Sequence, residues 1–191
     1  PPAHAPVTEP EVLALLERGR HREAFEGLMP IFRDRVFRLA SISKPIAAWA
    51  MLVAVEEGIV SLDDPVGPAT LRHLLAHAAG YGFDGPKPIV SPERKRIYSN
   101  TGIDVAAAHV ASAAGMAFDI YLDEAVFAPL GMSDTALQGS PAHGVSSTVT
   151  DLSKFVREVT HPALISLETA TMAVRPHFPA LGGIVPGVGR F

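Results

Sequence analysis

The sequence predicts one globular domain in which helices dominate. Of its 191 residues, 48% are hydrophobic and only 19% are charged, which is the composition of a folded chain rather than a disordered one. Most segments place apolar residues at helical spacing behind a capping residue, whereas few alternate apolar and polar residues with β-branched enrichment. A chain of this length has room for one substantial core, or for a domain with a smaller lobe.

The composition also narrows the classes of partner and chemistry. The net charge of −4 provides no basic surface for nucleic acid, and the absence of cysteine rules out disulfides and thiol chemistry. The apolar run from Pro45 is about half as long as a membrane span, so we expect a core helix and no membrane span. The first residues show no signal peptide, which favours a cytoplasmic over an exported location, although a mature exported protein would have lost its leader.

The first elements are two helices. Residues 9–29 place leucine and valine on one face and Glu and Arg on the other, and Pro30 is expected to end this amphipathic helix. A helix that is apolar all round follows from Pro45 to Val55, which predicts burial. Gly58 suits the position just after its end.

The remaining elements are capped helices separated by loops. In chain order we expect a helix from Thr70 through Ala78, a loop over 80–96, an alanine-rich helix capped by Asn100 or Thr101 and ending near Gly115, a helix from Phe118 to Phe127, one capped by Thr148 or Thr150 and ending at Val159, one from Ser166 to Ala173, and a loop over 180–191.

The feature that carries chemistry is Ser41-Ile-Ser-Lys44, directly before the buried helix. If the helix begins near Ser41, the i and i+3 side chains share a face, so the Lys44 amine lies beside the Ser41 hydroxyl. A serine hydroxyl is a weak nucleophile that needs such a neighbour, and a partly buried lysine can accept a proton. Taken alone, a serine at a helix start is more commonly a cap.

A second candidate motif, Tyr98-Ser-Asn100, joins the loop over 80–96 to the next helix. A tyrosine near a lysine loses its proton more readily, which makes Tyr98 a candidate general base. The Asn100 amide would orient a substrate carbonyl or the lysine. The alternative is a packed tyrosine beside an asparagine that caps the helix.

The histidines at 73 and 77 are the candidates for a metal site. His73 and His77 are four residues apart on a predicted helix, a spacing that two zinc ligands can use. The segment lacks the glutamate of the metalloprotease motif and no third ligand is evident, so we expect no metal. We interpret His143-Gly144 as part of a loop.

Five segments of the chain form an ordered set. In chain order they are FRLASISKP at 37–45, LRHLLAHAAG at 71–80, YSN at 98–100, FAPLGM at 127–132 and STVTDL at 147–152. Together they resemble the serine β-lactamase and penicillin-binding-protein superfamily, and the resemblance extends from Phe37 to Ala173. The Tyr-x-Asn motif is typical of its class C-like branch, which also contains D-alanyl-D-alanine carboxypeptidases and related esterases.

The resemblance implies a β-lactamase/transpeptidase-like α+β fold and a serine hydrolase. Ser41 would be the acylated nucleophile, with its backbone N–H in the oxyanion hole, and Lys44 would be its proton partner. Tyr98 would pass the proton to the leaving group and activate the deacylating water, and Asn100 would bind the substrate. The implied substrate is a small molecule or peptide with an ester or a D-Ala-D-Ala or lactam amide, esterase or carboxypeptidase activity is favoured, and no cofactor is implied.

The chain also departs from this family. The third motif, Lys-Thr-Gly or His-x-Gly, is not found, and residues 21–36 offer no strand pair where the family has one. We therefore expect one catalytic domain over 1–191 with much of its antiparallel sheet missing or incomplete, a mainly helical lobe over 41–160, and flanking segments over 1–40 and 161–191.

Such a domain is expected to be part of a longer protein, because helices without their sheet would be exposed. Two alternatives to the enzyme remain. One is a catalytically silent relative that binds a peptide or protein partner, and the other is a helical interaction domain in which Ser41 is a cap. The sequence does not fix the oligomeric state.

Overall fold

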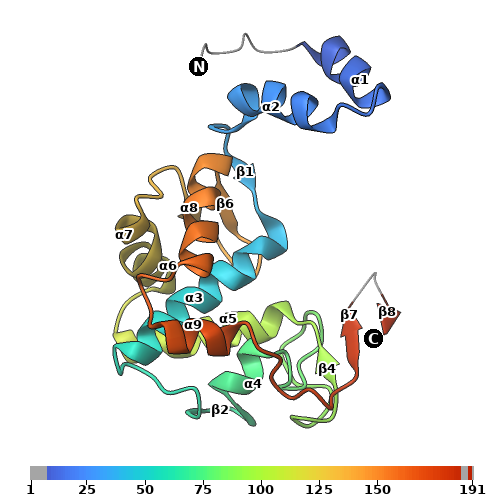
Figure 1. The fold of residues 1–191 in the computed structure, drawn as a ribbon. Helices are drawn as coiled ribbons and strands as arrows, with labels where there is room; N and C mark the ends of the chain where they lie inside the picture. Colours follow the sequence, from blue (N-terminus) through green and yellow to red (C-terminus); the bar gives the residue numbers. More distant parts are fainter. Residues whose placement is uncertain (1–7, 186–188, 191) are drawn as a thin grey trace.

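The computed structural model describes residues 8–185 and 189–190 and shows a mainly helical α+β chain (Figure 1). The helices are α1 Glu9–Glu17, α2 His21–Phe32, α3 Ser43–Glu56, α4 Leu71–Leu75, α5 Asn100–Ala114, α6 Phe118–Leu122, α7 Ala128–Leu130, α8 Val149–Thr160 and α9 Leu167–Ala173, with a 3₁₀ turn η1 Ala40–Ile42 and a π-helical turn η2 Asp123–Phe127.

The strands are short and form three small sheets. In the order of their pairing they are β1 Phe37–Arg38, β6 Val145–Ser147 and β5 Ala136–Leu137 in an antiparallel sheet, β2 Pro65–Val66 with β3 Ala69–Thr70 in a hairpin, and β4 Arg96–Ile97, β7 Gly183–Val185 and β8 Gly189–Arg190 in a mixed sheet. The expectation of a helical chain with an incomplete sheet is confirmed.

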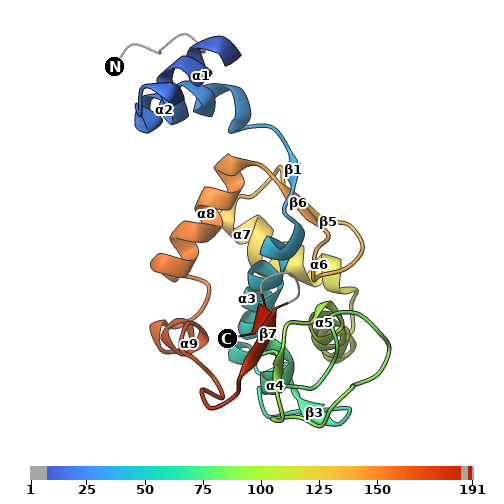
Figure 2. The same ribbon diagram turned by 90° about the vertical axis from the view of Figure 1, so that its right-hand side faces the viewer.

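Helix α3 forms the centre of the core and runs between α8 and α5 (Figures 1 and 2). Ile46, Ala47, Ala50 and Met51 are fully buried, as the apolar composition of this helix predicts. On the side of α8, Trp49 packs edge-on against a phenylalanine, and its indole N–H donates to the buried Glu158 carboxylate at 3.1 Å. The helix that carries Lys44 and directly follows the turn of Ser41 is therefore held from opposite sides.

The prediction of one helix over 9–29 is wrong, because the chain turns at Gly19. Gly19 has a φ of 71°, a left-handed conformation that glycine adopts without steric cost, and it separates α1 from α2. Pro30 does not end the second helix, which continues to Phe32. Only two helical residues follow Pro30, so its missing N–H and its ring affect only the last turn. The two helices pack on each other and project from the rest of the chain (Figure 1).

Most predicted helix boundaries are confirmed, and three are corrected. Thr70, Thr148 and Ser166 accept backbone N–H groups as helix caps, and Gly115 ends α5 with a φ of 71°. The cap of α5 is Ser99 instead of Asn100 or Thr101. Helix α4 ends at Leu75 and not at Ala78, since His77 has a φ of 57°. The helix predicted to end at Phe127 continues through η2 into α7 and ends at Leu130.

The loop predicted over 180–191 is also corrected within the residues that the structure describes. There β7 pairs in parallel with β4, and β8 pairs antiparallel with β7. The Arg96 guanidinium donates to the carbonyl of Ala76 after α4 and to the carbonyls of His177 and Phe178 in the segment before β7. The C-terminal segment is thereby fixed beside the end of α4.

None of the described helices alone is long and apolar enough to cross a bilayer. One pair meets the requirement of length and composition together, but Asn100–Ala114 and Phe118–Leu130 are bent by 87° to each other. Its core-facing residues are buried in the protein, which is typical of core helices.

Candidate active site

Ser41 lies in the 3₁₀ turn that leads into α3, and its side chain is exposed. The preceding Ala40 has a φ of 46°, a strained conformation for a residue with a Cβ, and strained residues cluster at functional sites. Among the described residues, the Ser41 backbone N–H donates to no backbone carbonyl. Ser43, the first residue of α3, is fully buried, and its hydroxyl oxygen accepts the Val145 N–H at 3.0 Å. This bond fixes the N-terminal end of the helix to β6.

Lys44 is buried, with 5% of its surface exposed, and its amine is surrounded by acceptors. Nζ lies 3.2 Å from the Ser41 hydroxyl oxygen, 2.6 Å from Asn100 Oδ1 and 3.0 Å from the Ala142 carbonyl. It also lies 4.6 Å from the centre of the Tyr98 ring. A lysine ammonium has three N–H donors, so three acceptors and an aromatic face match its charged form.

Asn100 joins the lysine to the loop over 80–96. Its Oδ1 accepts from Lys44, and its Nδ2 donates to Asp84 Oδ1 at 3.0 Å. These two contacts fix which way the amide points. Asn100 is also buried, so this arrangement fits the predicted orienting of the lysine, and its contact with a substrate stays a prediction.

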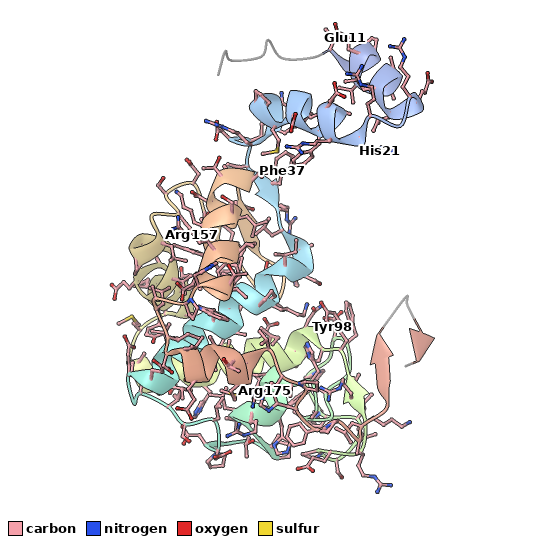
Figure 3. All side chains as sticks on the ribbon, viewed as in Figure 1. Glu11, His21, Phe37, Tyr98, Arg157 and Arg175 are labelled. Carbon is pink, nitrogen blue, oxygen red and sulfur yellow. The ribbon has the colours of Figure 1, made fainter. Side chains whose placement is uncertain are left out.

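Tyr98 faces the lysine through its ring. Besides the lysine amine, the ring contacts His77 at 4.9 Å and Phe83 at 6.1 Å between ring centres. In the described part of the chain, its hydroxyl makes no hydrogen bond to Ser41 or Lys44. Figure 3 shows Tyr98 on the side of the molecule where β7 lies. The structure thus brings Tyr98 to the predicted pair, while its role in proton transfer stays a prediction.

These side chains line a small cavity of about 230 Å³. Ser41, Lys44 and Tyr98 contribute to its wall together with His77. A larger groove of about 960 Å³ continues along α3 and shares Pro45, Ala48, Leu75 and His77 with the small cavity. The lining of the groove is mostly apolar; it includes Trp49, Leu52, Leu62, Val159, Met172 and Leu181.

Sequence reasoning missed three contributors to this site. Asp84 holds the Asn100 amide, the Ala142 carbonyl accepts from the lysine, and His77 contacts Tyr98. Asp84 lies in a loop without periodicity and Ala142 contributes only its backbone, so neither had a signal in the sequence. The pair His73 and His77 did have one, which we interpreted only in terms of metal binding.

The structure gives both of these histidines protein partners. His73 is bonded through Nδ1 to Thr70 and through Nε2 to Glu93 Oε1 at 2.8 Å, and His77 Nδ1 accepts the Ser99 N–H at 3.3 Å. Among residues 8–185 and 189–190, no three metal-ligating side chains converge. His143 lies exposed in a turn, as predicted for a loop residue.

The fold and the serine–lysine pair define the class as a β-lactamase/transpeptidase-like domain. The chain belongs to the β-lactamase family, whose family model matches residues 12–189. Among solved structures, it is similar to a β-lactamase from Mycobacterium bovis at 44% identity and a TM-score of 0.81, covering 83% of this chain and 60% of that one.

Curated relatives point to the same hydrolytic family. Penicillin-binding protein 4* of Bacillus subtilis is 28% identical over 56% of this chain and 31% of the relative, and esterase EstB of Burkholderia gladioli is 36% identical over 30% and 19%. The carboxypeptidase/endopeptidase AmpH of Escherichia coli is 24% identical over 56% and 38%. The chain thus spans less than half the length of these relatives. Members of the family are serine hydrolases that act on esters and amides.

Proposed function

We propose that this protein is a serine hydrolase that forms an acyl-enzyme through Ser41 on an ester or on a D-Ala-D-Ala or lactam amide. The observation that carries the proposal is the position of the Lys44 amine, 3.2 Å from the Ser41 oxygen and 2.6 Å from Asn100 Oδ1, in a cavity that Tyr98 also lines. A serine beside a cation that a third side chain orients, with a candidate base in the same cavity, is an arrangement that can activate the hydroxyl.

The chemistry follows from these positions. The Ser41 oxygen would attack the substrate carbonyl as Tyr98, the candidate general base in the same cavity, takes its proton, and the Lys44 charge would stabilise the negative charge that develops. The Ser41 N–H would donate to the carbonyl oxygen as it becomes an oxyanion. As the tetrahedral intermediate collapses, Tyr98 would return this proton to the departing alcohol or amine. Water would then attack the acyl-enzyme and give a proton to Tyr98, which would pass it to the Ser41 oxygen as the acid is released.

The family relatives support an ester or amide substrate without choosing between them. Esterase EstB and the carboxypeptidase AmpH are both similar to this chain. The apolar lining of the groove beside the cavity favours an acyl group with apolar character, and we propose an esterase or carboxypeptidase rather than a dedicated β-lactamase.

Covalent labelling tests the proposal. A fluorescent fluorophosphonate or a fluorescent penicillin should label the wild-type protein, and Ser41→Ala should abolish the label. Ser153→Ala is the matched control, because this serine is exposed on α8 and bonds only within its own helix. Absence of label in wild-type protein that circular dichroism shows to be folded would contradict the enzyme and favour the catalytically silent, peptide-binding relative.

A further inference from the structure

His77 occupies a conformation that its own helix does not explain. It follows α4 with a φ of 57°, a left-handed conformation that is uncommon for a residue with a Cβ and that marks a position where the fold requires it. This geometry turns the chain so that the carbonyl of His77 accepts the Ile97 N–H at 2.9 Å. The backbone of His77 is therefore bonded to the residue directly before Tyr98.

The ring of His77 contacts the residues on the other side. Its Nδ1 accepts the Ser99 N–H at 3.3 Å, and its ring centre lies 4.9 Å from that of Tyr98. His77 thus accepts from both neighbours of Tyr98 and packs against Tyr98 itself. Because Nδ1 is an acceptor, the proton of a neutral ring is on Nε2.

The surroundings favour the uncharged ring. Burial, the Lys44 charge and the Arg96 charge together lower the pKa of His77 to about 4. The titratable and charged groups that surround the ring are Lys44 on α3, Arg96 on β4, and Tyr98 in the segment between β4 and α5. A charged ring would face two cations and could no longer accept from Ser99.

We propose that His77 is a positioning residue, which as a neutral Nε2–H imidazole holds Tyr98 and Asn100 in register with Lys44. The inference rests on the proposed function, because it assigns His77 a part in that same site. Asn100 follows directly on the Ser99 N–H that His77 accepts, and Asn100 Oδ1 lies 2.6 Å from the lysine amine. A small displacement of this segment would separate the amide and the phenol ring from the amine, and misplacements of about 1 Å can cost roughly a hundredfold in rate.

The protonation state can be measured without any activity. Long-range ¹H–¹⁵N correlation spectra of the histidine rings, assigned with His77→Asn, should show His77 as the Nε2–H tautomer at pH 7. A ring that carries its proton on Nδ1, or a charged ring at pH 7, would overturn the proposal. In His77→Gly, the Ser99 and Asn100 amide resonances should shift, whereas an unchanged pair of resonances would also contradict it.

The kinetic test compares two replacements of His77. Asn adopts a positive φ readily and places an acceptor oxygen where Nδ1 lies, whereas Gly adopts it without strain and offers no acceptor. The rate constant for fluorophosphonate labelling at saturating reagent should fall about tenfold or more in His77→Gly and should be restored to within about threefold of wild type in His77→Asn. The half-saturating reagent concentration should stay unchanged in both variants.

The outcomes separate this proposal from the proposed function. If the wild type is not labelled, the proposed function fails, and the tautomer and the amide shifts still decide whether His77 positions the segment. If wild type and both variants are labelled at equal rates per folded molecule, His77 has no part in the site and the proposal is wrong.

Discussion

The stability of the fold should depend on pH through His77. The pKa of this ring is about 4 in the folded chain and 6.5 in the absence of its environment. As the pH falls below 6.5, the His77 ring binds a proton in the unfolded chain but stays neutral in the folded chain. Stability is therefore lost between pH 6.5 and about 4. Below about pH 4 both states are protonated and the loss ends.

The magnitude follows from these two values. A tenfold change in proton affinity corresponds to about 1.36 kcal/mol, so the full loss is about 3.4 kcal/mol, of which about 2.5 kcal/mol should have occurred by pH 4.5. Several carboxyls, among them Asp64 and Asp151, also have lowered pKa values, so their protonation in acid lowers the free energy of unfolding as well. Their contribution is the same in a variant that lacks only the His77 ring.

The measurement is urea unfolding of wild type and His77→Asn at pH 7.5 and pH 4.5. Trp49 is a suitable probe, because it is the only tryptophan in the sequence and is buried against Glu158. The free energy of unfolding of the wild type should fall by about 2.5 kcal/mol more than that of His77→Asn. Equal falls in the two proteins, within about 0.5 kcal/mol, would refute the argument from burial and neighbouring charge.

Three further predictions concern the loop over 80–96 and the start of α5, the segments on either side of Tyr98. The Ser99 hydroxyl both caps α5 and donates to the Gly82 carbonyl at 2.6 Å. Ser99→Ala should therefore lower the free energy of unfolding by about 2 kcal/mol. The control Ser166→Ala removes an exposed cap and should lower it by about 1 kcal/mol. Gly80→Ala should cost more than about 3 kcal/mol, because its Cβ would lie 2.0 Å from the Val90 carbonyl oxygen. Gly58→Ala, at a similar positive φ (72° against 84°) but in open space, should cost about 1 kcal/mol in the same assay. Asp84→Ala frees the amide of the asparagine that orients the lysine and should slow fluorophosphonate labelling about tenfold; labelling at the wild-type rate would exclude that role.

The sequence predicted the helices that have strong local signals. The caps Thr70, Thr148 and Ser166 are residues whose side chains satisfy N-terminal N–H groups, and Gly115 is a residue for which a left-handed end has no steric cost. Where several possible capping residues stand in a row, as in Ser99-Asn100-Thr101, composition could not decide between them, and the prediction of Asn100 or Thr101 was wrong. The structure decides through tertiary contacts, since the Asn100 side chain is engaged by Lys44 and Asp84.

The elements that were mispredicted depend on long-range pairing or on single residues. Strands β4 and β7 are two and three residues long and pair across more than eighty positions, so no periodicity could reveal them. The break at Gly19 was hidden because one glycine is tolerated within an amphipathic pattern. Lys44 and Asn100 are 56 positions apart, and only the resemblance to a family brought their motifs together before the structure did.

The contacts of Lys44 also bear on which group takes the serine proton. With three acceptors and the Tyr98 ring around its amine, the lysine is arranged as a proton donor, and in this arrangement it has no lone pair directed at Ser41. A cation so placed stabilises an anion beside it, which can be the serine oxygen or a tyrosine phenolate. The neutral ring of His77 next to Tyr98 adds no competing positive charge. We therefore propose a division of roles in which Lys44 supplies charge and Tyr98 accepts the proton.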